Sequence, residues 1–99
     1  SSARLPALSD VPTVAESGFP GFDADQWYGV VAPSGTPPEI VARLNAAINQ
    51  SLESGDLKSK LAAEGALSAA STPQAFGTHI QREIARWKPV IAAGKITAN

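Results

Sequence analysis

Few residues in this chain have types and spacings that could do chemistry. His79 is the only histidine and stands one helical turn before Glu83, a spacing typical of surface pairing. A zinc site needs three or four ligands, and a catalytic histidine needs a partner that orients it. The sequence places no such set around His79. We therefore interpret His79 as a surface residue of a helix.

Paired carboxylates at Asp23 and Asp25 could act as an acid and a base. They lie in the segment "FPGFDAD" without a base or nucleophile nearby, so turn formation and solvation explain them better. No serine occupies a Gly-x-Ser-x-Gly elbow, and the chain has no cysteine to supply a thiolate. We expect no catalytic residue, metal ligand or cofactor, and a protein that is not an enzyme.

The loop "APSGTPPE", residues 32–39, raises the question of an anion cradle at a helix N-terminus. It lacks the lysine and the glycine spacing of a phosphate loop, and its two prolines remove backbone donors. We interpret it as a helix start, with Thr36 as the N-cap and Glu39 closing a capping box. Anion binding is the alternative.

Trp27 and Tyr28 are the ambiguous pair. Large aromatic residues on a strand usually belong to a core, but at a strand end they can line a ligand cleft. They are the candidate ligand-binding residues of this chain.

The elements that must position these residues follow from the hydrophobic pattern. Residues 26–32, "QWYGVVA", predict a strand that is apolar on both faces, as in a layered α/β domain. Apolar residues at helical spacing predict helices over about 37–55, 56–64 and 73–94. Pro89 predicts a kink or a break near 85–88.

Shorter signals fill the rest of the chain. Thr13 and Glu16 form a capping box around one or two helical turns, and Gly18 supplies a left-handed exit. Thr72 repeats the cap before a proline. Residues 66–71 are weak and could form a short edge strand.

Composition excludes several classes of protein. The net charge of −1 gives no reason to expect nucleic acid, and 43% hydrophobic residues permit a packed core in a chain of 99 residues. The apolar runs are too short to span a bilayer.

One strand cannot make a sheet, because its backbone N–H and C=O groups need partners. The partners must lie in residues absent from this chain or in a second copy. We therefore expect a symmetric homodimer, formed by pairing of residues 26–32 or by swapped helices.

The order of motifs resembles a known family. "DVPTVAESGFPGF", "WYGVVAPSGTPPEIVARLNAAI" and "STPQAFGTHIQREIARWKPVI" together resemble the C-terminal third of the solute-binding proteins of tripartite tricarboxylate transporters, the TctC-like or Bug family. The likeness runs from about Arg4 to Lys95. Pro89 departs from the pattern, since the last helix of the family usually continues there.

The resemblance implies an α/β fold, the C-terminal part of a type II periplasmic-binding-protein fold with helices around an incomplete sheet. Residues 1–99 would be the C-terminal segment that completes the first of two lobes. The resemblance also implies a periplasmic protein that captures small carboxylates for a membrane permease. The family's carboxylate-holding loops lie earlier in the chain, so no ligand residue carries over. The rival hypothesis is an autonomous small helical module for interaction or dimerisation.

Overall fold

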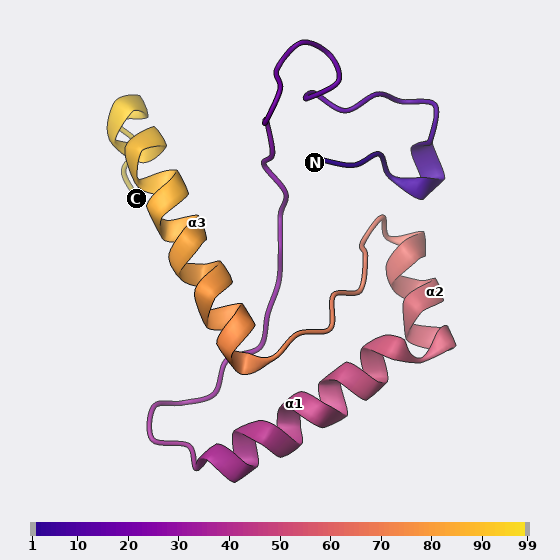
Figure 1. The fold of residues 1–99 in the computed structure, drawn as a ribbon, viewed down its shortest axis with the longest axis vertical. Coiled ribbons are helices and arrows are strands. Elements are labelled where there is room, and N and C mark those ends of the chain that lie inside the picture. The colour runs from indigo at the N-terminus through magenta and orange to yellow at the C-terminus, as the bar shows by residue number, and fades with distance from the viewer. Residues whose placement is uncertain (1, 99) are drawn as a thin grey trace.

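The computed structural model describes residues 2–98, which form three α-helices, one short 3-10 turn and long irregular segments (Figure 1). The three predicted helices are confirmed, with ends close to those expected. The elements are η1 Pro6–Leu8, α1 Pro38–Glu53, α2 Gly55–Ala63 and α3 Pro73–Gly94.

The predicted α/β class is wrong for this chain, because residues 2–98 contain no strand. Residues 26–32 run alongside α3 as an irregular trace, and residues 66–71 are also without regular structure (Figure 1). A strand exists only where a neighbour completes its hydrogen-bond ladder, and the described part of the chain offers none. The described residues are thus a helical piece and not helices around a sheet.

The start of α1 differs from the predicted cap. Its N-cap is Pro37, which makes no side-chain cap bond. The Thr36 hydroxyl instead donates to the Pro33 carbonyl at 2.8 Å, and the Thr36 N–H bonds the same oxygen at 3.2 Å. This turn, with Gly35 at φ 84°, directs the Thr36 side chain back into the loop and away from the first helical turn.

Two other predicted caps are confirmed. The Thr72 side chain accepts a 3.1 Å bond from the Ala75 N–H at the start of α3. The Thr13 N–H donates to Glu16 at 2.8 Å while the Glu16 N–H donates to the Thr13 hydroxyl at 3.1 Å, which is the reciprocal capping box. Gly18 follows at φ 105°, as its left-handed role requires.

Pro89 lies inside α3 without the predicted break, since the helix continues to Gly94. A proline deprives a helix of one N–H donor and crowds the preceding turn.

Asparagine side chains tie α1 to the loop before α3. The amide nitrogens of Asn45 and Asn49 each donate to the Ser71 carbonyl at 2.9 Å. Asn49 also accepts from the Ser71 N–H at 3.3 Å. These bonds fix the place where α3 begins relative to α1.

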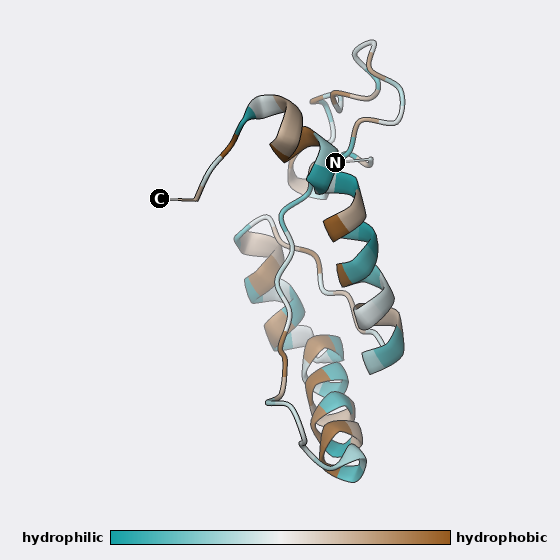
Figure 2. Cartoon of the chain, turned by 90° about the vertical axis from the view of Figure 1, so that its left-hand side faces the viewer, coloured by the Kyte–Doolittle hydropathy of each residue, from teal (hydrophilic) through white to brown (hydrophobic). Residues whose placement is uncertain are grey.

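The described residues bury no hydrophobic side chain. The radius of gyration is 16.6 Å, whereas a compact chain of this length has about 13 Å. Hydrophobic residues recur along the helices (Figure 2), and several of them, such as Leu44, Ile84 and Ile91, are exposed. Within residues 2–98, we find no helix whose length and apolar character would let it cross a bilayer.

Candidate functional site

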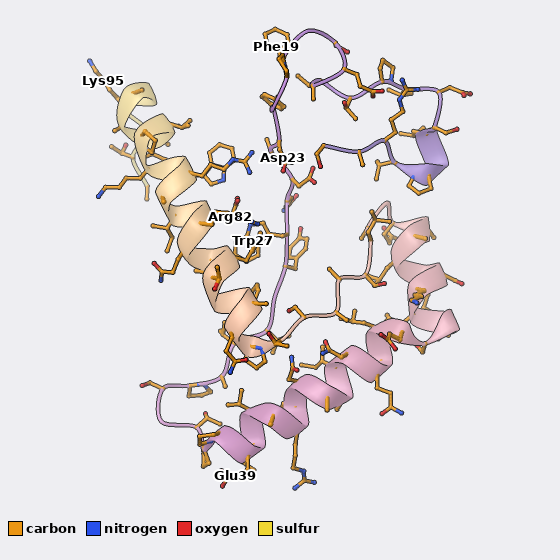
Figure 3. All side chains as sticks on the ribbon, viewed as in Figure 1. Phe19, Asp23, Trp27, Glu39, Arg82 and Lys95 are labelled. Carbon is orange, nitrogen blue, oxygen red and sulfur yellow. The ribbon has the colours of Figure 1, made fainter. Side chains whose placement is uncertain are left out.

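Three rings from two segments meet beside α3. Trp27 lies edge-on to Phe76, with ring centroids 5.7 Å apart, and edge-on to His79 at 4.8 Å. Phe76 and His79, on one face of α3, stack at 6.3 Å. Figure 3 shows Trp27 directed from the irregular segment toward α3, near Arg82. Edge-to-face contacts of this kind add to the energy of area burial, so they dock the segment on the helix.

Gly29 permits this docking. A Cβ atom at Gly29 would overlap the ring of Phe76. The glycine is needed for space and not for backbone conformation, since its φ is not positive.

A pocket of about 310 Å³ opens beside the three rings. Tyr28 forms part of its wall and is 84% exposed. The Tyr28 hydroxyl accepts a 2.7 Å bond from the Gln26 amide. The lining residues are Trp27, Tyr28, Ala69, Ser71, Ala75, Phe76 and His79.

A cation stands next to this pocket. Nη2 of Arg82 lies 3.2 Å from Nδ1 of His79. Because a guanidinium can only donate, this contact requires Nδ1 to be the acceptor. His79 therefore links the aromatic rings to a positive charge, a role that the interpretation as a surface residue missed.

A polar network lies further along α3. Glu83 is 7% exposed and is the one buried residue among those described. Its carboxylate accepts bonds from the Trp87 indole N–H at 3.0 Å and from Arg86 at 3.3 Å. The Trp87 bond, and then Arg86, lower the pKa of Glu83 against the opposing effect of burial. Arg86 also lies 3.9 Å from Asp23 of the irregular segment.

Between this network and Trp27 lies an apolar groove of about 500 Å³, called here the α3 groove. Its lining residues are Trp27, Ile80, Glu83, Ile84, Trp87, Lys88 and Ile91.

Two of the residues singled out from the sequence, Trp27 and Tyr28, line one pocket in the structure. The structure adds to this pocket Phe76 and His79, which the sequence analysis missed. Helical spacing places Phe76 and His79 on one face of α3, but no local signal shows that Trp27 reaches them. The described residues contain no group of three or more potential metal ligands.

The chain matches, over residues 1–96, the family model described as "Tripartite tricarboxylate transporter family receptor". The chain belongs to this receptor family. The prediction of a TctC-like or Bug-family sequence is thereby confirmed.

Similar sequences come from several bacteria. Protein BugT of Bordetella pertussis is 42% identical over 92% of this chain and 28% of its own length. A UPF0065 protein in the tcbD-tcbE intergenic region of Pseudomonas sp. (strain P51) is 39% identical over 97% of this chain and 29% of its own length. The chain thus spans less than a third of these relatives. No solved structure is matched.

Proposed function

We propose that this chain is a segment of a longer extracytoplasmic solute-binding receptor that captures small carboxylates in the periplasm and delivers them to a membrane permease. It is a binding protein and not an enzyme. The observation that carries the proposal is the match of residues 1–96 to a transporter receptor family.

The pocket at Trp27 and Tyr28 is the part of the ligand cleft that this segment would contribute. Its volume of about 310 Å³ lies at the small end of the range for ligand sites, and its mostly apolar wall carries a few polar groups. Arg82, held beside His79, offers a positive charge suited to a carboxylate. The remaining polar groups would come from the rest of the receptor.

Calorimetric titration of a receptor of family length tests this proposal. The protein is BugT with its matched region replaced by residues 1–96 of this chain, titrated with citrate, succinate, glutamate and nicotinate. We expect saturable heat for at least one of them. Trp27→Ala should weaken that binding by about tenfold, whereas Phe19→Ala, at an exposed ring outside the pocket, should leave it unchanged.

The isolated chain provides the complementary measurement. It should show no saturable heat with the same carboxylates, because specific binding needs polar groups that converge from several directions. A chimera that folds and binds none of the four, or that binds equally well without Trp27, would contradict the proposed site.

A second candidate function is an autonomous helical module that forms a homodimer. The observation in its favour is the exposure of large apolar residues such as Val30, Val31 and Leu67. The reading frame upstream of Ser1 distinguishes the two: a signal peptide and roughly two hundred further residues favour the receptor, whereas a start codon close to Ser1 favours the module.

A further inference from the structure

The chain exposes far more surface than a compact protein of its mass. Its accessible surface is 8033 Å². A compact monomer of 10.2 kDa exposes about 5,300 Å². Much of the difference is apolar, because no hydrophobic side chain among residues 2–98 is buried. An exposed apolar surface of this kind marks a site of interaction with another molecule or segment.

The α3 groove is part of this uncovered surface. Ile84 and Ile91, at helical spacing along its floor, are 57% and 46% exposed. Trp27 closes one side of the groove, and Lys88 adds a positive charge to its lining. Glu83, the acidic residue in the lining, already accepts bonds from Trp87 and Arg86. The groove therefore fits an apolar segment with a carboxylate placed to meet Lys88.

We propose that the α3 groove is a docking site for the receptor polypeptide that lies outside the region matched by this chain. The inference rests on the proposed function, in which the chain is one segment of a longer receptor. In BugT and in the Pseudomonas sp. (strain P51) protein, the matched region makes up only 28% and 29% of the length. The larger remainder has enough surface to cover the groove.

The distribution of the exposed apolar residues favours this occupant over a second copy. A two-fold dimer buries one self-complementary patch on each chain, in general about 1,000–2,500 Å² for an obligate interface. Here the exposed apolar residues occur from Leu5 to Ile96, in the N-terminal irregular segment, α1, α3 and the loops. One patch would leave most of them in water, whereas a larger surrounding polypeptide can cover several faces.

Cysteine labelling measures whether the groove is covered. The chain has no cysteine, so Ile84→Cys introduces a single thiol within it. Ala93→Cys is the matched control, because residue 93 lies about half a turn around α3 from Ile84. Labelling rates with a maleimide, resolved by peptide mass spectrometry, are compared between the isolated chain and the BugT chimera, each normalised to the denatured protein.

We expect Ile84→Cys to react rapidly in the isolated chain at every protein concentration. In the chimera its rate should fall by about tenfold or more, while the rate of Ala93→Cys stays the same. Equal Ile84→Cys rates in a folded chimera and in the isolated chain would overturn the proposal. Protection in the isolated chain that disappears on dilution would assign the groove to a second copy. Protection of the isolated chain by citrate would assign it to a small ligand.

Coexpression is the second measurement if the chimera does not fold. The tagged chain is expressed with a separate BugT polypeptide that lacks the matched region. We expect the two to copurify in equal amounts, Ile84→Glu to abolish copurification and Ala93→Glu to leave it intact. Absence of copurification, or equal copurification of both variants, would overturn the proposal. Neither measurement needs a solute, so a failure of docking is distinguishable from a failure of carboxylate binding.

Discussion

The indole N–H of Trp87 donates a 3.0 Å hydrogen bond to Oε2 of Glu83, one turn earlier on α3. The other carboxylate oxygen of Glu83 meets Arg86 at 3.3 Å, and the guanidinium of Arg86 lies 5.4 Å from the centre of the Trp87 ring. A buried carboxylate is costly unless its oxygens are satisfied. The three side chains therefore hold one another in place, and two of them, Glu83 and Trp87, line the α3 groove.

The pKa of Glu83 is lowered, mainly by the Trp87 bond. Its contribution to stability is therefore present above the ordinary glutamate pKa of about 4.3 and is lost as the pH falls through the lower folded value. In a Trp27→Phe background, the fluorescence of Trp87 should change over this acidic range and should be flat after Glu83→Gln. Glu39→Gln, at an exposed carboxylate of α1, is the control. The same acid transition in Glu83→Gln would contradict the assignment.

Arg4 and Glu16 form a bidentate pair, with Nε and Nη2 of Arg4 at 2.9 Å from the two carboxylate oxygens. The Arg4 bonds, followed by the Thr13 N–H, lower the pKa of Glu16 to about 2. The stabilisation should be full above about pH 4.3 and lost as the pH falls toward 2. An NMR titration should show that Arg4→Gln raises the Glu16 pKa only in part, because the Thr13 N–H still donates. An unchanged value would show that the pair does not form in solution.

Gly29 and Phe76 should behave as a coupled pair. Gly29→Ala places a methyl group into the Phe76 ring and should destabilise the docked segment by about 1–3 kcal/mol. In the double variant Gly29→Ala/Phe76→Leu, the smaller leucine leaves room for the new methyl group. The stability lost by the double variant should therefore be less than the sum of the losses in the two single variants. Near-ultraviolet circular dichroism of Trp27 during denaturant unfolding measures this. Additive losses would mean that the two residues do not touch.

The two threonines that precede helix-opening prolines should respond differently. Thr72→Ala removes a real cap on α3 and should cost about 1 kcal/mol. Thr36→Ala loses only a hydroxyl bond within the loop and should cost clearly less. Thermal unfolding followed by circular dichroism at 222 nm compares them. An equal loss of stability in the two variants would show that Thr36 caps α1 in solution.

The sequence by itself determined the features that depend on residues close together in the chain. Helical spacing located α1, α2 and α3, and side-chain chemistry within four residues identified the caps at Thr13 and Thr72. The motif order was enough to indicate the receptor family. These signals are local, so each is readable without knowing where the rest of the chain lies.

Only the tertiary structure decided what residues 26–32 do. Their β-branched and aromatic composition predicts a strand, but strand formation requires backbone partners from elsewhere, and none is present within residues 2–98. Trp27 instead packs on Phe76 and His79, about fifty positions later, through side chains alone. The contacts of Glu83 with Trp87 and Arg86 are compatible with helical spacing, but the approach of Asp23 to Arg86 joins residues more than sixty positions apart. Such contacts join residues far apart in sequence, and propensity carries no information about them.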